Sequence, residues 1–468
     1  MRKSWRLPIV LSVFLTAVTA CLLLSGTIRW LVFWGLAIAI VAIVKRRWLL
    51  FAVCLAVLIG CLRVSVAERS VGFARMTDGE FVLLRGVIKR RESLNERTQR
   101  LSVGEATIDM PKYPLYDERA VIEAMCIRRP PSGREELRAL RNRYAKGITY
   151  ACETYNVRVI AAAAPCWQHP LICGHAFIVE RVNELWPRPV RSLVLGLLLG
   201  DKGDFPQDVL TQFSAAGISH IVALSGFNIT VIVVSLEAAA LRLRVAKRYR
   251  PAVIIVLIAL FTVFVGAAAS IVRAACMGSL AVYGKSCGRQ ASARRLLLIS
   301  AAAMTLANPY TLLYDIGFQL SCGATFGLLA FSEWFEARLF FVPERAGLRG
   351  SLSTTLAASL PTLPLLAWQF GSLSIIAPLS NMLVLPLIPH IMSASAATVA
   401  VSFVTPSLAQ LLAGVVSRAC RYILDVSAWA AAMPYATVHT EIPFAVCLIA
   451  SLAIIVFSYY VERQNQAP

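Results

Sequence analysis

The sequence predicts a mainly α-helical, polytopic membrane protein with one small extracytoplasmic β-barrel, of the OB type, inserted between its transmembrane segments. Hydrophobic residues make up 58% of the 468 residues and charged residues only 15%, whereas soluble proteins carry about 25% charged residues and need a polar surface. The apolar residues gather in runs of the length that crosses a bilayer, and one long polar stretch interrupts them. These observations exclude a wholly soluble, a disordered and a fibrous protein.

Residues 1–63 are predicted to form N-terminal transmembrane helices. Three apolar runs follow one another here, at Leu7–Gly26, Ile28–Val44 and Trp48–Leu62. Because cytoplasmic loops are enriched in Lys and Arg, the basic N-terminus and the Lys45–Arg47 loop are expected in the cytoplasm. The third run therefore ends on the outer side of the membrane.

Residues 64–175 form the polar stretch and are predicted to be the extracytoplasmic OB-like domain. Alternating and β-branched residues predict strands at Glu80–Lys89, Leu101–Asp109 and Tyr150–Ala161. A charged helix is expected at Arg134–Lys146, ending at a glycine. About five strands and one helix suit a small barrel, although the sequence alone does not close it.

Residues 176–464 are predicted to be a second transmembrane region. The basic loops Arg242–Arg250 and Lys285–Arg295 fit the cytoplasmic side when two spans separate them. The chain's formal net charge of +20 is thereby assigned largely to membrane orientation rather than to a ligand. The expected spans are 218–241, 251–268, 270–284, 294–307, 311–331, 352–372, 375–404, 407–433 and 441–460.

Basic residues cluster with an aromatic residue in the first predicted strand of the outer domain. Grooves that combine cations with aromatic platforms bind single-stranded nucleic acid on OB folds. A charge run of this kind is also the ordinary composition of a solvated surface, so both interpretations stay open. The candidate DNA-binding residues are Arg85, Lys89, Arg90 and Arg91, with Phe81 nearby.

Most of the 12 cysteines lie in or beside apolar runs and are expected to behave as small buried hydrophobes. In the outer segment an oxidising compartment permits disulfides. The preferred pair is Cys166 with Cys173, which closes a short loop. A zinc site is disfavoured because no Cys-x-x-Cys motif is present.

Several motifs stand out in the second transmembrane region. The stretch from Gly196 reads GLLLGDKGDFPQDVLTQFSAAGISHIVALSGFNITV, with Phe213-x-x-x-Gly217-x-x-His220 and Ala-Leu-Ser225-Gly226-x-Asn228 inside it. Further along lie Arg273-Ala-x-x-Met277 and Asp315-x-Gly-Phe-Gln319-Leu-Ser321. A proline-rich segment then carries Pro378, Asn381 and Pro386.

On these motifs the chain resembles the ComEC/Rec2 competence family over roughly residues 1–460. The resemblance implies a polytopic channel that carries single-stranded DNA across the bacterial cytoplasmic membrane during natural transformation. Asn228 stands where the family usually has a second histidine. Many family members carry a metallo-β-lactamase-like domain, a presumed nuclease, but this sequence has no His-x-His-x-Asp-His cluster, so no nuclease and no metal are expected in this chain.

Among the candidates, Arg273 has the clearest free-energy cost of insertion into a membrane. An arginine within a span costs about 2.5–3.5 kcal/mol on insertion scales, so it must face protein or water. It is expected to contact a passing phosphate or to hold a gate through Asp315, but a purely structural pair remains an alternative. Asp315 and Gln319 are four residues apart and would share one helix face, where Asp315 is favoured as an orienting group.

The segment from His220 to Asn228 is expected to interrupt a helix at Ser225-Gly226. Irregular backbone at membrane depth is tolerated where it lines a cavity, and freed N–H groups suit phosphate oxygens. The alternative is that Gly226 only permits close helix packing. An intramembrane hydrolase built on Ser225 and His220 is disfavoured, since no Gly-x-Ser-x-Gly elbow is present.

The predicted function is therefore passive guidance of single-stranded DNA through a pathway near His220, Ser225, Gly226, Asn228, Arg273, Asp315, Gln319 and Asn381. No catalytic residue and no cofactor are expected, and no P-loop is present. A DNA receptor, a separate nuclease, a cytoplasmic translocase and membrane lipids are the implied partners, and the bacterial inner membrane is the expected location. The rival class is a small-solute or ion transporter whose outer domain is a structural cap.

Overall fold

The computed structural model describes residues 13–15, 18, 59, 60, 62, 64, 81–93, 98–103, 106–111, 116, 120–127, 150–153, 157–161, 170–201, 205–222, 226–288, 292–344, 347–440 and 442–466. The predicted N-terminal spans and the helix at Arg134–Lys146 lie almost wholly outside these residues. The chain divides into two compact units, Met1–Gln168 with Ala275–Gln319, and His169–Ala274 with Leu320–Pro468. Each unit is described on its own.

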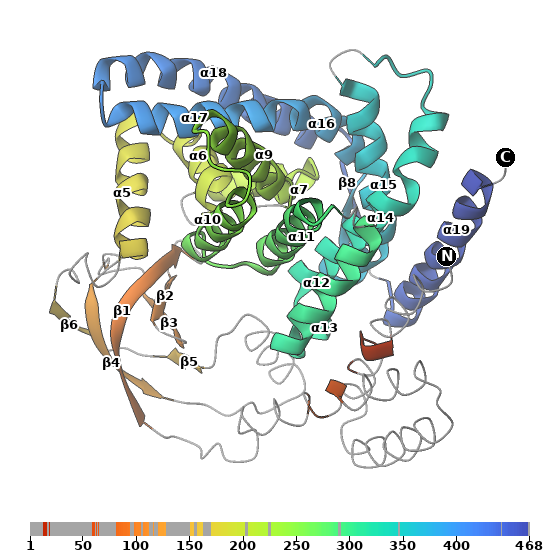
Figure 1. Cartoon of the computed structure of the whole chain (residues 1–468). Helices are drawn as coiled ribbons and strands as arrows, with labels where there is room; N and C mark the ends of the chain where they lie inside the picture. Colours follow the sequence, from red (N-terminus) through yellow and green to blue (C-terminus); the bar gives the residue numbers. More distant parts are fainter. Residues whose placement is uncertain are drawn as a thin grey trace. The chain divides into compact units, whose positions relative to one another are not determined.

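Most of the described chain is helical, as the sequence predicts (Figure 1). The helices up to residue 286 are α5 (Pro170–Leu185), α6 (Val190–Leu199), α7 (Gln207–Ala215), α8 (Ser219–Val222), α9 (Gly226–Arg242), α10 (Arg250–Phe264) and α11 (Ala269–Ser286). The later ones are α12 (Ala293–Ala307), α13 (Tyr310–Tyr314), α14 (Ile316–Arg338), α15 (Leu348–Phe370), α16 (Ala377–Val384), the short 3₁₀ helix η2 (Leu385–Leu387), α17 (Ile388–Ser402), α18 (Pro406–Ala431) and α19 (Phe444–Gln466).

Two stretches among the described residues are both long and apolar enough to cross a membrane, Ala377–Ser402 and Phe444–Glu462. Two shorter helices, Val190–Leu199 and Arg250–Phe264, are apolar as well. These stretches support the predicted membrane class. The larger number of spans and their orientation stay predictions, although each expected span after residue 218 corresponds to helical structure.

One of the expected spans is not a continuous helix, and in another residues 223–225 lie outside the described residues. The stretch 218–241 contains the one-turn α8 and then α9, which begins at Gly226. The stretch 311–331 is divided between α13 and α14 at Asp315, whose backbone is extended (φ −97°, ψ 101°). Hydropathy averages over such breaks, because an interruption of a few residues hardly changes the mean of a long apolar window.

The largest apolar core of the second unit is built by α5, α6, α7, α16, α17 and α18. Trp186, which follows α5, is 1% exposed in this core, and its indole N–H donates to the Ala413 carbonyl oxygen of α18 (3.0 Å). A buried indole needs such an acceptor for its polar edge. The contact fixes α18 against the chain segment between α5 and α6.

Helix α14 approaches α15 very closely at one glycine. A Cβ at Gly327 would overlap the Ala357 carbonyl oxygen and would lie 2.7 Å from Cγ of Pro361. Pro361 lies inside α15 and has no N–H to offer the carbonyl four residues before it. A smaller cluster of Phe331, Ala357 and Val461 then joins α14, α15 and α19, with Phe331 stacked on Phe457 (centroids 5.6 Å apart).

The outer segment contains strands, as expected. They are β1 (Phe81–Ser93), β2 (Thr98–Val103), β3 (Ala106–Pro111), β4 (Val121–Ile127), β5 (Tyr150–Glu153) and β6 (Val157–Ala161). The predicted strands at Leu101–Asp109 and Tyr150–Ala161 are each two strands. A strand pattern does not reveal a reversal between two apolar runs of equal period, which is why the sequence predicts a single strand at each place.

The strands form one sheet in the order β1-β2-β3-β5-β4-β6, and β1 also pairs with β4. The pairs are antiparallel except β3 with β5, which are parallel. Between β4 and β5 the ladder consists of Ile127 opposite Glu153. Ile88, Leu101, Ile108 and Ile122 are fully buried and form the centre of the sheet's own apolar cluster. The predicted closed OB barrel therefore remains a proposal, while a β-sheet region with its own core is observed.

A second, two-stranded sheet joins β7 (Ser372–Ser374) and β8 (Thr437–His439) in the helical part of the chain. Its antiparallel pairing places Ser372 opposite His439 and Ser374 opposite Thr437. The sequence predicts no strand at either place, because three-residue runs give too little periodicity to detect. This sheet connects the segment after α15 with the segment before α19.

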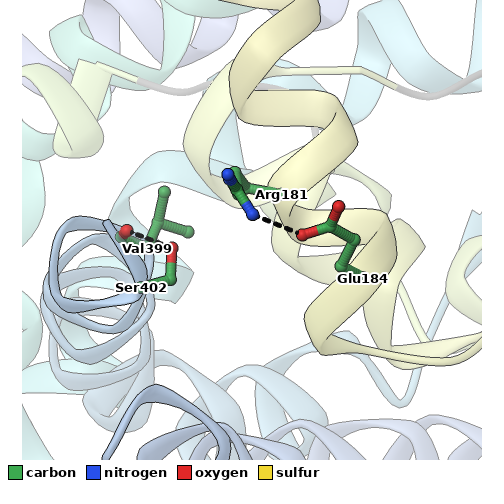
Figure 2. Close-up of polar contacts among 4 residues, drawn as sticks. All are labelled: Arg181, Glu184, Val399 and Ser402. Carbon is green, nitrogen blue, oxygen red and sulfur yellow. Dashed lines mark hydrogen bonds and ion pairs between the residues drawn. The ribbon is translucent and has the colours of Figure 1, made fainter. Parts of the chain in front are cut away.

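Near the end of the Ala377–Ser402 stretch an arginine lies beside two stacked aromatic rings. The Arg181 guanidinium of α5 lies 5.6 Å from the ring centre of Phe177 and 5.5 Å from that of Phe403, and these two rings stack on each other. Figure 2 shows Arg181 paired with Glu184 (2.7 Å), beside the end of α17 where the Ser402 hydroxyl donates to the Val399 carbonyl oxygen. Basic and aromatic side chains near the end of an apolar helix are typical of membrane–water interfaces.

The cysteine predictions are partly tested. Cys173 at the start of α5 is disulfide-bonded. Its predicted partner, Cys166, lies outside the described residues, so the pairing stays a prediction. Five cysteines of the apolar region are free thiols, namely Cys276, Cys287, Cys322, Cys420 and Cys447.

Candidate functional site

Three of the sequence motifs meet at one point in the second unit. Arg273 of α11 is 6% exposed, and its Nε donates to the Ser321 hydroxyl of α14 (2.9 Å). A Cβ at Gly226, the first residue of α9, would lie 3.1 Å from Nη2 of Arg273 and 3.4 Å from Cβ of Ala274. Three separated segments thus converge on one buried guanidinium.

A side chain at Gly226 has little room, since a Cβ there would lie 3.1 Å from Nη2 of Arg273. The start of α9 lies directly against α11, and a small residue lets two helix backbones approach closely. The sequence leaves open whether Gly226 interrupts a helix or permits close packing. The structure supports close packing, since Arg273 lies against Gly226, whereas residues 223–225 lie outside the described residues and the interruption stays a prediction.

Asp315 differs from its predicted position inside a helix. It is 7% exposed, lies between α13 and α14, and its Oδ1 accepts the Phe318 N–H (3.1 Å). This is the N-cap geometry that satisfies a free donor at the start of a helix. The predicted pairing of Asp315 and Gln319 on one helix face is therefore wrong, whereas the predicted orienting role of Asp315 agrees with this hydrogen bond.

Gln319 completes the same junction from the other side. Its Nε2 donates to the carbonyl oxygens of Leu312 (3.0 Å) and Leu313 (2.9 Å), which belong to α13. The last carbonyls of a helix have no partner within the helix. Asp315 and Gln319 together supply hydrogen-bond partners to free backbone groups on both sides of this break.

A second group of motif residues makes a neutral packing junction. Phe213 is 1% exposed, and Gly217 follows α7 with a left-handed backbone (φ +71°). The Ile218 N–H donates back to the Phe213 carbonyl oxygen (2.9 Å), as in a Schellman cap. A Cβ at Gly217 would overlap Cβ of Ala377, so the glycine is needed for both its conformation and its contact with α16.

Two serines hold α16 against the end of α7. The Ser374 hydroxyl donates to the Ala215 carbonyl oxygen (2.6 Å), and the Ser380 hydroxyl donates to that of Ala216. Both acceptors are carbonyls from the last turn of α7, which need external donors. The motif around Phe213 and Gly217 is therefore explained by packing and capping.

Asn381 lies next to this junction and is 3% exposed. Among the described residues its side-chain Oδ1 is buried without a hydrogen-bond donor. Its backbone carbonyl accepts the Leu385 N–H at the end of α16, just before Pro386. An unsatisfied buried carbonyl costs about 1–3 kcal/mol, which marks Asn381 as a residue that packing alone does not explain.

The remaining predicted residues are less tightly placed. His220 is exposed on α8 and Asn228 lies in the first turn of α9, whereas Ser225 lies outside the described residues. The structure therefore brings Gly226 and Arg273 together, and Asp315 with Gln319. Sequence reasoning omitted Ser321 from the candidates, although it is the last residue of the motif that begins at Asp315.

In the β-sheet region Arg85 is exposed on β1. The register places it opposite Glu123 of β4, which in turn lies opposite Arg158 of β6. A cation, an anion and a second cation thus form one row across three strands. Lys89, Arg90 and Arg91 occupy later positions of β1.

No cluster of metal ligands is found in the part of the chain that is described. No group of three or more His, Cys, Asp or Glu residues lies close enough there to hold an ion. The described site consists of a guanidinium, hydroxyls and amides around broken helices. Guanidinium, hydroxyl and amide groups are hydrogen-bond donors of the kind that phosphate oxygens accept.

Comparison with known proteins gives two matches. A family model described as competence protein matches residues 197–464. ComE operon protein 3 of Bacillus subtilis (strain 168) is 28% identical over 209 residues, which cover 45% of this chain and 26% of that protein. The alignment thus spans about a quarter of the B. subtilis protein. No solved structure matches.

Proposed function

Because the chain belongs to the ComEC/Rec2 family of competence proteins, we propose that it is a membrane channel that takes up single-stranded DNA during natural transformation. The family membership supports a role in DNA uptake. The channel, its single-stranded substrate and its inward direction are the finer parts of the proposal. The observation that supports these finer parts is the buried Arg273. Its Nε donates to the Ser321 hydroxyl, and its Nη2 lies close to Gly226 at the start of α9.

A buried guanidinium suits a path for phosphates. Arginine stays charged, and its planar fork of donors matches phosphate oxygens better than an ammonium does. Arg273 lies within the apolar α11, where a charge is costly unless it serves a purpose. Ser321 fixes the Nε edge of the guanidinium and thereby orients the rest of the group.

Two helix ends belong to the same sequence motifs as this arginine and its partner Ser321. Helix α9 begins at Gly226 as the structure describes it, and the first N–H groups of a helix have no partners in their own helix. Asp315 and Gln319 stabilise the break between α13 and α14. We assign the path for the strand to these breaks, with His220, Ser225, Asn228 and Asn381 as further candidates along it.

The domain organisation is part of the same proposal. Residues 1–63 form N-terminal transmembrane helices, 64–175 an extracytoplasmic OB-like domain, and 176–464 the channel domain. The barrel is supported by the pairing of β1 with both β2 and β4 and by the parallel pair β3–β5, which are the pairings of an OB fold. Its Arg85, Lys89, Arg90 and Arg91 collect or orient the strand.

The proposed channel is passive and is not itself an enzyme. A DNA receptor delivers the substrate, a separate nuclease converts it to a single strand, and a cytoplasmic translocase supplies the driving force. The protein lies in the bacterial cytoplasmic membrane with its β-sheet region outside. Membrane lipids cover the apolar stretches Ala377–Ser402 and Phe444–Glu462.

The test is deletion followed by complementation. The deletion strain should lose transformation, and the wild-type gene should restore it. Arg273→Ala should reduce transformation by about tenfold to a hundredfold, since a hydrogen bond to a charged group is worth about 1.5–3 kcal/mol. Labelled duplex DNA should still bind the cell surface, but it should not become resistant to added nuclease.

Arg338→Ala is the matched control. Arg338 is also an arginine of the helical region, but it is exposed at the end of α14 and stacks on Trp334 (3.7 Å). It should transform normally. Normal transformation of the deletion strain would refute the channel and favour a small-solute or ion transporter, which predicts no uptake defect.

The outer region is tested by the salt dependence of DNA binding. The purified full-length protein should bind an oligonucleotide with an affinity that falls as salt rises. Each phosphate of single-stranded DNA that a basic side chain neutralises adds about 0.7 to the steepness of the logarithmic salt slope. The variant with Arg85, Lys89, Arg90 and Arg91 all changed to Gln should therefore show a shallower slope. Binding that does not respond to salt would contradict this role.

A further inference from the structure

The turn that joins α9 to α10 is strongly basic. Residues 242–250 contain five Lys and Arg residues and no Asp or Glu. Four of these cations are exposed, and within the part of the chain that the structure describes none of the four forms an ion pair; they are Arg242, Arg244, Lys247 and Arg248. The turn therefore presents positive charge that no neighbouring carboxylate compensates.

An arginine ends α9 in a backbone conformation that usually belongs to glycine. The Arg244 N–H donates to the Leu241 carbonyl oxygen (3.1 Å), and the Val245 N–H donates to that of Ala240 (3.0 Å). These are the two hydrogen bonds of a Schellman cap, in which the left-handed position is normally a glycine. Here Arg244 occupies it with φ 52°. A residue held in such a conformation is strained, and strain of this kind gathers at functional sites.

Hydrogen bonds also order the rest of the turn. Arg250 Nε donates to the Val245 carbonyl oxygen (2.7 Å), and the Tyr249 N–H donates to that of Ala246 (2.9 Å). The Arg248 guanidinium lies 5.7 Å from the centre of the Tyr249 ring. The positive-inside rule depends on the number of cations in a loop and not on their conformation. Membrane orientation alone therefore does not account for an ordered turn with a strained arginine.

Exposed apolar side chains lie between and beside the cations. Leu243 is 77% exposed, and Leu241 and Tyr249 are each 58% exposed. Helix α10, one of the shorter apolar helices, continues this pattern with exposed residues at the spacing of one helix face: Val253, Val256, Leu257, Leu260 and Val263. The apolar face of α10 therefore begins directly at the basic turn.

This combination of side chains favours a lipid layer over a nucleic acid as the occupant. Single-stranded nucleic acid binds where several aromatic rings stack on its bases. Residues 241–250 contain one aromatic residue, Tyr249, and it already has Arg248 near its ring. A lipid layer accepts all the groups, because leucines enter the acyl region, a tyrosine lies at the headgroup level and cations pair with anionic headgroups.

We propose that the α9–α10 turn is a binding site for the headgroup phosphate of an anionic phospholipid. Arg242, Arg244, Lys247 and Arg248 hold the phosphate, since guanidinium and ammonium groups both bind its oxygens. Leu243 enters the layer beneath the headgroups. The sequence places this loop in the cytoplasm, where the membrane surface is negative. The site is separate from Arg273 and does not depend on DNA uptake.

Photo-cross-linking of the full-length protein identifies the occupant. Residue 249 is replaced by p-benzoylphenylalanine, and the protein is placed in nanodiscs of equal parts phosphatidylglycerol and phosphatidylcholine. After irradiation, mass spectrometry should find phosphatidylglycerol adducts in roughly tenfold or greater excess, because each basic residue near an anionic surface contributes about fivefold in affinity. Arg244→Gln should lower this excess several-fold, and adding Lys247→Gln should lower it again.

The same cross-linker at residue 444 is the matched control. Phe444 is 56% exposed at the start of the candidate span Phe444–Glu462, and no Lys or Arg occurs between residues 422 and 462. It should capture the two lipids about equally. Equal capture at residue 249, or no lipid adduct there, would overturn the proposal. Added single-stranded oligonucleotide should leave the lipid adducts unchanged; oligonucleotide adducts in their place would show that DNA is the occupant.

Arg244→Gly gives a second test with two opposite effects. In phosphatidylcholine discs the variant should melt at a higher temperature than the wild type, because glycine adopts the left-handed backbone without strain. Phosphatidylglycerol should then raise its melting temperature less than that of the wild type. Arg338→Gln is the control, since it removes one exposed charge from a helix end that also carries Glu333 and Glu336, and it should keep the full lipid effect. If Arg244→Gly also keeps it, the proposal is wrong.

Discussion

Two junctions in the helical part are built around a glycine, and they differ in what the glycine meets. At Gly217 the neighbours are neutral: Cβ of Ala377 and the hydroxyl of Ser374. At Gly226 the nearest neighbour is the guanidinium of Arg273. Both glycines belong to the same stretch of sequence motif. One sequence motif therefore contains a packing constraint and a polar site only a few residues apart.

At the first junction, a substitution of Gly217 should lower the stability of the folded protein. Gly217→Ala introduces a Cβ that overlaps Ala377 and forces an alanine into a left-handed backbone. The left-handed conformation costs about 1–2 kcal/mol and overpacking about 1–3 kcal/mol, so a large fall in melting temperature is expected. Detergent-solubilised protein followed by fluorescence-detected gel filtration after heating measures it.

Gly350→Ala is the matched control for that substitution. Gly350 lies in α15, where a Cβ would meet nothing within 4 Å. An alanine there should be neutral or stabilise the helix by about 0.5–1 kcal/mol. If both alanine variants melt alike, the close contact at Gly217 does not matter for folding.

A smaller loss of stability is expected for Ser380→Ala. The substitution removes the hydroxyl that donates to the Ala216 carbonyl oxygen, and leaves that acceptor buried at the end of α7. The expected cost is about 1–3 kcal/mol, read as a melting shift. Ser374→Ala removes a partly buried bond to Ala215 and should shift melting less; the reverse order would contradict the role given to burial.

Gly226→Ala should separate stability from uptake. Its Cβ would meet the end of a flexible side chain, Nη2 of Arg273 at 3.1 Å, which can shift by a few tenths of an ångström. Melting should therefore change little, while transformation falls because the guanidinium is displaced. A fall in melting temperature as large as that of Gly217→Ala would show that the two junctions are of the same kind.

The smallest effect is expected for Ser321→Ala. It removes one hydrogen bond to the Arg273 Nε and leaves the charge in place. Transformation should fall several-fold less than with Arg273→Ala, and Ser321→Thr, which keeps a hydroxyl, should retain more activity than Ser321→Ala. An alanine variant that transforms as well as wild type would show that Ser321 does not orient the arginine.

The sequence predicts the helical class, the outer strands and the motif residues. It does not show which motif residues serve packing and which form a polar site. The Asp315 carboxylate was expected within a helix and instead caps α14. The difference arises because a break of one residue in a helix hardly changes the mean hydropathy of the surrounding sequence window. Gln319 was expected in the same stripe, and its bonds to Leu312 and Leu313 become visible only when α13 and α14 are separate.

Composition and motif spacing by themselves determined that this chain is apolar, helical and similar to competence proteins, because burial in a membrane and helix periodicity are local properties of sequence. Tertiary structure alone decided that Gly226, Arg273 and Ser321 meet and that Gly217 contacts Ala377. These facts depend on which distant helices pack together, and residues so far apart along the chain leave no periodic signal that one sequence can reveal.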